Sequence, residues 1–382
     1  MAIFGQGLGG IGNVLSVLLP FLFVLTIVVF IHELGHFLVA RWAGVKVLTF
    51  SLGFGPELAG FNDRQGTRWK ISAIPLGGYV KFFGDESEAS TPASFETLAN
   101  MTEEERAGSF HHKRVGPRAA IVAAGPIANF ILAIVIFTCL FTFFGKPSTT
   151  ARVDKIEANS AAAAAGFQVG DVVTMIDGTT IGSFSDMQRV VGIHAGDQLT
   201  FTVKRGDSTL QLRGTPEQRE VKDPFGNAHR LGVMGITRAT SPGDVVTERV
   251  DPATAFWLGV KETWFVVDRT FAYIGGIFTG REAADQVGGP LRIAQISGQV
   301  ATIGLAALIH LTAVLSISIG LLNLFPVPLL DGGHLLFYAV EVVRGRPLSE
   351  RAQEMGFRIG LGLVLMLMVF ATYNDILHLA AS

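Results

Sequence analysis

The sequence contains little charge and almost no cysteine. Only 16% of its 382 residues are charged, and the one cysteine is Cys139. A single cysteine excludes an intrachain disulfide framework, and Cys139 lies in an apolar run, which favours a small buried or lipid-facing role. The formal net charge of −2 gives no reason to expect a nucleic acid partner. A hydrophobic content of 49% is instead typical of an integral membrane protein.

The first 32 residues contain no Lys, Arg, Asp or Glu. A cleaved signal peptide is one interpretation, but such a peptide has a basic start, a short apolar core and a small-residue cleavage site. No basic residue precedes the apolar core here, and that core continues directly into His32-Glu33-Leu34-Gly35-His36. We therefore predict a retained transmembrane helix.

Four segments are long enough to cross a bilayer, which takes about 20 apolar residues. They are residues 14–39, residues 119–145, a stretch within residues 293–330, and the weaker residues 356–376. Lys and Arg gather in the connection between the first and second segments and in the loop between the third and fourth, so the positive-inside rule places both connections in the cytoplasm. Both termini and the long connection between the second and third segments are then expected on the other side. The basic residues are Arg41, Lys46, Arg64, Arg68, Lys70, Lys81, Arg106, Lys113, Arg114, Arg118, Arg344, Arg346 and Arg351.

The long connection is predicted to hold a small α+β domain at residues 146–240. Short alternating runs such as residues 199–203 are separated by Gly and Asp turns, which is typical of strands. Residues 165–178 resemble a strand-turn-strand run of bacterial PDZ domains, and residues 185–194 favour a short helix. Residues 241–292 are expected to be a linker.

Within that linker, residues 254–278 mix aromatic residues with charges. This pattern favours an amphipathic helix on the outer membrane surface. A fifth span is disfavoured by the internal charges. On the cytoplasmic side, residues 68–83 alternate and contain a turn at residues 75–78, which predicts a β-hairpin.

The cluster at the end of the first span carries the strongest functional signal. Ionisable residues inside a membrane are costly and indicate a functional site, and His-Glu-x-x-His is typical of zinc hydrolases. His32 and His36 share one face of a helix, so both can bind one zinc ion that keeps an open position for water. Glu33 would be the general acid and base. The alternative is a helix-capping pair of histidines without metal.

Asp331 is the best candidate for a third ligand. It is the first charged residue after Arg292, and it follows Pro326 and Pro328, which break the helix. A carboxylate at this depth needs a cationic partner, although a helix N-cap is the alternative. His334 could support the site, but an ordinary polar loop residue is the favoured interpretation.

The pair His111 and His112 could suggest a second metal site. Adjacent residues of a helix point apart, however. We therefore interpret the pair as part of a basic rim at the membrane interface.

Several segments together resemble the site-2 protease family of intramembrane zinc metalloproteases, in the bacterial branch similar to regulator of sigma-E proteases but with a single PDZ domain. The matching segments are His32-Glu33-Leu34-Gly35-His36, Gly77-Gly78-Tyr79-Val80-Lys81-Phe82, Ala124-Gly125-Pro126-Ile127-Ala128-Asn129, and Asn323 through Asp331-Gly332. The resemblance implies a mostly α-helical polytopic membrane protein with about four transmembrane helices, a membrane-associated β-hairpin or sheet, and an inserted PDZ domain. It also implies a bacterial inner membrane location.

The resemblance assigns roles as well. It implies that His32, His36 and Asp331 hold zinc, that Glu33 is the acid/base, and that Asn323 orients the substrate or stabilises the oxyanion. An interhelical hydrogen bond is the open alternative for Asn323. The implied substrates are single-span membrane proteins already cut by another protease, such as anti-sigma factors, other regulators or signal-peptide remnants. The PDZ ligand would be a substrate C-terminus.

Two other classes of protein are alternatives to a protease. A catalytically silent membrane PDZ scaffold or chaperone predicts that Glu33→Gln leaves function intact. A transporter would show internal repeats and midplane charges in several spans. The second and third spans have no charged residue and no repeat is evident, which disfavours a transporter.

Overall fold

The computed structural model describes residues 2–85, 100–148, 150–222, 228–238, 246–280 and 288–381. The chain divides into two compact units. The first comprises residues 1–137, 259–267 and 287–381, and the second comprises residues 138–258 and 268–286. Each unit is described by itself below.

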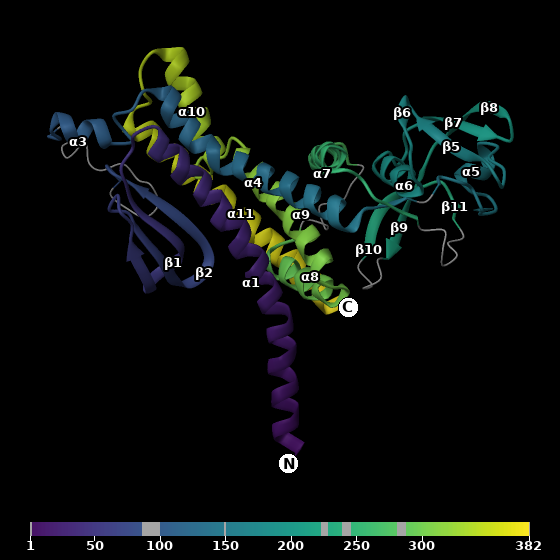
Figure 1. The fold of residues 1–382 in the computed structure, drawn as a ribbon, viewed down its shortest axis with the longest axis horizontal. Coiled ribbons are helices and arrows are strands. Elements are labelled where there is room, and N and C mark those ends of the chain that lie inside the picture. Colours follow the sequence, from purple (N-terminus) through teal and green to yellow (C-terminus); the bar gives the residue numbers. More distant parts are fainter. Residues whose placement is uncertain are drawn as a thin grey trace. The chain divides into compact units, whose positions relative to one another are not determined.

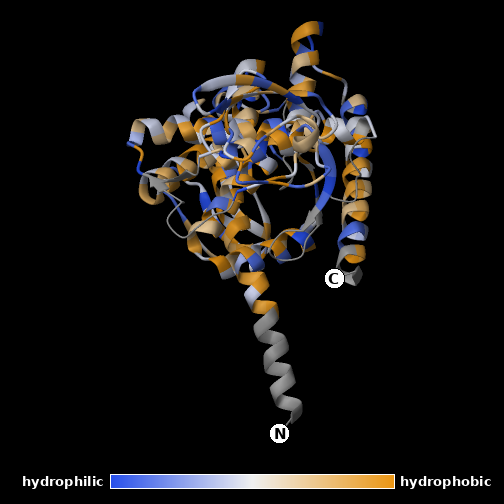
Figure 2. Cartoon of the chain, turned by 90° about the vertical axis from the view of Figure 1, so that its right-hand side faces the viewer, coloured by the Kyte–Doolittle hydropathy of each residue, from blue (hydrophilic) through white to orange (hydrophobic). Residues whose placement is uncertain are grey.

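The first unit is mostly helical. Its long helices are rich in Leu, Ile, Val and Phe, and Figure 2 colours the helix that leads to the C-terminus largely as hydrophobic. In chain order its elements are α1 (Ala2–Trp42), β1 (Val47–Asn62), β2 (Arg68–Phe82), α3 (Glu103–Gly108), α4 (Val115–Phe144), α8 (Pro290–Ile303), α9 (Leu305–Leu324), α10 (Asp331–Arg344) and α11 (Glu350–Ala381). The last residues of α4 belong to the second unit.

Four helices in the described part of the chain are long and apolar enough to cross a membrane. They are Val14–Trp42, Val115–Phe144, Leu305–Leu324 and Arg351–Leu377. These correspond to the four predicted segments. Many of their large apolar side chains are exposed, among them Val369, which is 67% exposed. A lipid environment would cover such side chains.

The predicted third segment contains two helices, because the charge-free stretch is longer than one span. Helix α8 ends at Ile303 and α9 begins at Leu305, with Gly304 between them at a φ of 136°. Of these two helices, only α9 is long and apolar enough to cross a membrane. Both helices contact α1.

The sheet of the first unit lies beside α1 (Figure 1). Phe50 in β1 pairs with Trp69 and also with Val80, so it lies between two segments of β2. The chain therefore reverses between those two residues, where residues 75–78 were predicted to turn. The predicted hairpin is wrong in one respect: its two arms pair with β1 and not with each other.

A turn at residues 63–67 joins β1 to β2 and ties the sheet to α1. The Asp63 carboxylate accepts hydrogen bonds from the backbone amides of Gln65 and Thr67, as expected of an Asx turn. It also forms an ion pair with Arg41 in the last turn of α1. This contact fixes the sheet to the helix that carries the His-Glu-x-x-His motif.

The second unit contains short strands around its own apolar core. Strands β6, β5, β7 and β8 form a four-stranded sheet in that order, and the predicted helix at residues 185–194 is α6. Phe201 and Ile176 are fully buried between these elements. Its elements are β3 (Lys146–Ser148), β4 (Lys155–Ile156), α5 (Ala161–Ala164), β5 (Val172–Ile176), β6 (Thr179–Thr180), α6 (Phe184–Ile193), β7 (Leu199–Arg205), β8 (Ser208–Gly214), β9 (Glu217–Lys222), β10 (Ala228–Val233), β11 (Ile236–Thr237) and β12 (Val246–Glu248).

Helix α7 spans Pro252–Phe278 and confirms that residues 254–278 are helical. Its first turn is capped by Asp251, whose carboxylate accepts hydrogen bonds from the backbone amides of Ala253 and Thr254. Helix α7 is not among the four membrane-span candidates of the described residues. Residues 241–245 and 281–287 of the predicted linker lie outside the described residues.

Candidate metal centre

Helix α1 places the two imidazoles of the motif together. His32 and His36 lie one turn apart, and their Nε2 atoms are 3.3 Å from each other. Both side chains are buried, at 9% exposure. The helix is thus the direct cause of a two-nitrogen site at the end of a long apolar segment.

The break between α9 and α10 supplies the carboxylate. Helix α9 ends at Leu324, and α10 begins at Asp331 after a segment that contains both predicted helix-breaking prolines. Leu329 in this segment has a φ of 104°, a conformation that residues other than glycine rarely adopt. The Asp331 Oδ2 atom lies 3.2 Å from His32 Nε2 and 3.5 Å from His36 Nε2.

The three side chains fit a metal ion. One ligand atom from each of His32, His36 and Asp331 lies within 4.8 Å of the others. The buried Asp331 Oδ2 atom has no hydrogen-bond partner, which is costly for a carboxylate unless a cation neutralises it. Burial alone would raise the pKa of Asp331, but the two imidazoles hold that pKa below its ordinary value, so the carboxyl is ionised. Two imidazoles, one carboxylate and room for water form a typical donor set for catalytic zinc.

The tautomer of His36 also fits a metal. Its Nδ1 atom donates a hydrogen bond of 2.8 Å to the backbone carbonyl of Ile121 in α4. A carbonyl can only accept, so Nδ1 carries a proton, and the neutral imidazole then has its free lone pair on Nε2, which faces the site. This is the arrangement that metal-binding histidines require.

Helix α4 approaches α1 closely because both helices have a glycine at their crossing. A Cβ atom on Gly35 would lie 2.3 Å from the carbonyl oxygen of Ala124, and a Cβ on Gly125 would lie 2.2 Å from His36 Nε2. Small residues allow membrane helices to pack at such short distances. The backbone of α4 thereby forms one wall of the metal site.

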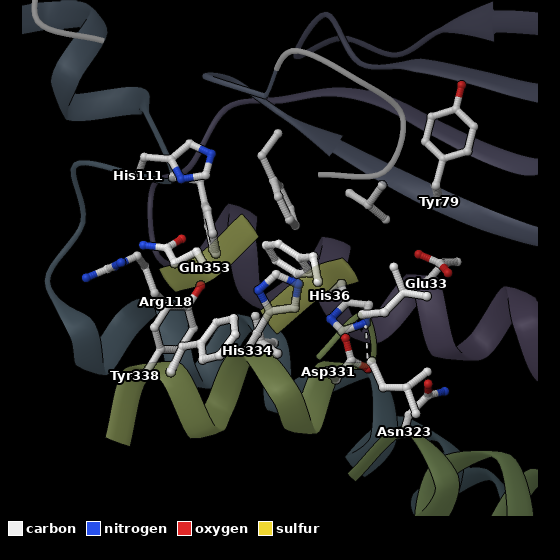
Figure 3. Close-up of a pocket in the computed structure, with 18 of the residues that line it drawn as sticks. Glu33, His36, Tyr79, His111, Arg118, Asn323, Asp331, His334, Tyr338 and Gln353 are labelled. Atoms are coloured by element: carbon white, nitrogen blue, oxygen red, sulfur yellow. Dashed lines mark ion pairs between the residues drawn. The ribbon is translucent and has the colours of Figure 1, made fainter. Parts of the chain in front are cut away.

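A cavity of about 360 Å³ opens next to the three ligands. Glu33 and Asn323 both line it, together with His32, His36 and Asp331. Figure 3 shows Glu33, Asn323 and the pair His36–Asp331 around this space. Among the described residues Asn323 has no side-chain hydrogen bond, so the interhelical bond that was the alternative for this residue is not observed there.

The other predicted histidines have separate places. His334 lies one turn into α10, lines the same cavity and packs against the Phe357 ring, with 5.4 Å between centroids; burial lowers its pKa. His111 bonds to Asp85 at 2.8 Å, whereas His112 bonds to Ser109 at 3.1 Å. The last two histidines therefore do not converge on one ion.

Two groups that contact the imidazoles have no separate role in the prediction from the sequence. They are the carbonyl of Ile121 and the side chain of Asn129, both in α4. The carbonyl leaves no signal in the sequence, because any residue supplies one. Asn129 does leave a signal, as an amide in an otherwise apolar segment.

Two imidazoles and a carboxylate that fit a metal ion, carried in part by a His-Glu-x-x-His motif in an apolar helix, are typical of zinc hydrolases. Comparison with known families agrees: Peptidase family M50, the site-2 protease family, matches residues 20–367. The chain belongs to this family, and the resemblance seen in the sequence is confirmed. The family and the apolar helices support a membrane metalloprotease of the site-2 type.

Curated relatives cover nearly the whole chain. A protein of Agrobacterium fabrum named "Putative zinc metalloprotease" is 53% identical over 365 residues, covering 96% of this chain and 97% of the relative. A protein of the same name from Rhizobium meliloti is 50% identical and covers 93% and 95%. The "Metalloprotease MmpA" of Caulobacter vibrioides is 40% identical and covers 95% and 96%. These names support zinc as the metal.

Solved structures that match include one that corresponds to a small part of the chain. It is the PDZ domain of an SdrC-like protein from Listeria monocytogenes, 22% identical, with a TM-score of 0.19. The match covers 24% of this chain and 87% of that one. At this level of similarity, the PDZ nature of the second unit stays a prediction.

Proposed function

We propose that this protein is a zinc endopeptidase that hydrolyses peptide bonds within the transmembrane segments of single-span membrane proteins. The observation that carries the proposal is the convergence of His32, His36 and Asp331 at the end of an apolar helix. Membership of the site-2 protease family supports it. The proposed substrates are anti-sigma factors, other regulators and signal-peptide remnants.

The roles of the residues follow from their places around the cavity. His32, His36 and Asp331 would hold zinc, which when bound polarises a carbonyl and lowers the pKa of water. Glu33 lines the cavity without being one of the three ligands. It would take the proton from the attacking water and deliver it to the leaving amine as the C–N bond breaks. The Asn323 amide would donate a hydrogen bond to the substrate carbonyl oxygen.

The β1–β2 sheet would hold the unwound substrate. A helical substrate hides its peptide bonds in its own hydrogen bonds, so it must become extended before cleavage, and a strand edge can bind an extended segment. Strand β2 passes the catalytic helix at Gly78, where an added Cβ would lie 3.1 Å from Glu33 Cγ. Exposed apolar side chains on the sheet support contact with lipid, for example Leu58 and Ile71.

The proposed location is the bacterial inner membrane. Because Lys and Arg gather between the first two spans, the site would lie near the cytoplasmic face. Both termini and the domain at residues 146–240 would then be outside the cytoplasm. That domain would act as a PDZ domain that binds the new C-terminus of a substrate already cut by another protease, or as a filter of substrate size.

Co-expression with tagged single-span substrates tests the proposal. Wild type should release a cytoplasmic fragment, whereas Glu33→Gln should accumulate the uncut membrane stub. A control with Glu341→Gln alters a carboxylate that lines the same cavity but pairs with Arg118. Identical processing by wild type and Glu33→Gln would refute the proposal and favour a silent scaffold.

A further inference from the structure

Asn129 is a fully buried polar residue next to one of the metal ligands. It lies in α4 with 0% exposure. Its amide nitrogen Nδ2 is 3.3 Å from Nδ1 of His32. Its amide oxygen Oδ1 is buried and has no hydrogen-bond partner. A buried amide oxygen without a partner is costly and calls for a functional explanation.

The protonation that zinc requires of His32 supplies the explanation. His32 Nε2 faces Asp331 Oδ2 at 3.2 Å, so Nε2 is the atom directed at the metal site. A ligating Nε2 needs a free lone pair, which leaves the proton on Nδ1. That Nδ1–H must find an acceptor, and Asn129 is the side chain within reach.

The amide of Asn129 can meet this demand by turning. The oxygen and nitrogen of an amide are nearly equivalent in shape, and their assignment depends on the hydrogen bonds around them. A half-turn about the last side-chain bond would place Oδ1 where Nδ2 now contacts His32. We propose that Asn129 is a positioning residue whose amide oxygen accepts the Nδ1–H of His32 in the metal-loaded enzyme, and so holds that imidazole in the zinc-binding tautomer.

The two imidazoles would then be oriented in the same way by one helix. His36 donates its Nδ1–H to the Ile121 carbonyl, and His32 would donate its Nδ1–H to the turned amide of Asn129, two turns further along α4. Groups that orient metal-bound histidines typically contribute 10–100-fold to metal affinity. This inference rests on the proposed function, because it requires that His32, His36 and Asp331 hold zinc.

Helix α9 holds Asn129 in place from the other side. The hydroxyl of Ser316 donates a hydrogen bond of 2.9 Å to the backbone carbonyl of Asn129. A Cβ on Gly320 would lie 3.1 Å from the Asn129 Cβ, so the two backbones are close. Asn129 therefore lies where α4 contacts both α1 and α9. Ser316 offers a control that alters the same helix contact without touching His32.

The test measures zinc affinity of the full-length chain in detergent micelles, by competition with a chromophoric chelator. Asn129→Leu removes the acceptor at similar volume and should weaken zinc binding about 10–100-fold. Asn129→Asp keeps an acceptor and cannot donate when ionised, so it should bind zinc at least as tightly as wild type. Ser316→Ala should bind zinc as wild type does.

The aspartate variant separates positioning from packing. If Asn129 instead donates to His32, Asn129→Asp will lose zinc as Asn129→Leu does, which overturns the inference. The comparison of Asn129→Asp with wild type decides this even if Asn129→Leu does not fold. Zinc affinity of Asn129→Leu equal to wild type also overturns it. A wild-type chain that binds no zinc would instead refute the metal site itself.

Discussion

Asp331 Oδ2 lies 3.2 Å from His32 Nε2, so the start of α10 meets the end of the first apolar helix. The two residues are far apart in the sequence. The carboxylate oxygen is buried and has no hydrogen-bond partner. Burying a carboxylate in this way is costly unless a cation balances its charge. A metal ion bound here would join the first membrane helix to the start of α10, which follows the third membrane helix.

Removal of the metal should therefore destabilise the fold as well as stop cleavage. A ligand that binds only the folded state at about 1,000 times its Kd stabilises that state by about 4 kcal/mol. We expect chelator-treated protein to unfold at a lower temperature and to regain both stability and activity with Zn²⁺. Mg²⁺ should restore neither, because it prefers an octahedral shell of oxygen ligands. Thermal unfolding in detergent measures the effect, and an unchanged unfolding temperature would contradict it.

Glu33→Gln should separate catalysis from metal binding. Loss of a general acid/base typically costs about 10²–10⁴-fold in rate, whereas the three ligands remain. We expect wild-type zinc content together with a loss of cleavage of this size. Cleavage assays on a purified single-span substrate and elemental analysis of the same sample measure both. Loss of zinc from the variant would show that Glu33 is a ligand instead.

Gly125→Ala should damage the metal site through a single methyl group. That methyl would overlap the rings of His36 and His32, and such overpacking typically costs about 1–3 kcal/mol. We expect weaker zinc binding and lower activity. Gly116→Ala is the matched control on the same helix, because nothing lies within 4 Å of its added Cβ. Equal zinc affinity of the two variants would contradict the close approach of α4.

The second unit contains an ion pair between a buried carboxylate and a partly exposed arginine. The fully buried carboxylate of Asp171 accepts hydrogen bonds of 2.7 and 2.8 Å from Arg205. Removing one partner of a fully buried pair costs about 3 kcal/mol, and we expect a smaller loss here because Arg205 is partly exposed. Arg205→Met should therefore increase hydrogen exchange in β7 at pH 7, and Arg213→Met on the neighbouring strand should not.

The same pair predicts a dependence on pH. Burial alone would raise the pKa of Asp171, but the hydrogen bonds from Arg205 hold it below its ordinary value. The unfolded value is about 3.9. The pair therefore stabilises the unit fully above about pH 4 and loses its effect as the pH falls through the lower, folded pKa. The difference between wild type and Arg205→Met should shrink in that acidic range. A constant difference would contradict the assignment.

The part of the site that the sequence predicts is the part that depends on local geometry. His32 and His36 share a face because of helical spacing alone. Asp331 is identifiable because a charge after a long uncharged stretch needs a partner. The four apolar helices are predictable because bilayer thickness fixes their length.

What could not be predicted depends on contacts between distant segments. The strand Val47–Asn62 was not predicted, and its position between the two arms of β2 depends on pairing between strands rather than on alternation within one. The hydrogen bond from His36 to the Ile121 carbonyl requires the crossing of α1 and α4. Asn129 was visible as a polar residue, but its partner His32 was not.

Zinc K-edge X-ray absorption on the full-length protein in detergent tests the central claim most directly. The account predicts a first shell of nitrogen and oxygen atoms at about 2.0–2.2 Å, with two imidazoles in wild type. Asp331→Ala should lose a carboxylate oxygen from this shell, and His36→Ala should lose an imidazole. A folded wild-type protein that binds no zinc, or a shell unchanged by Asp331→Ala, would contradict the account.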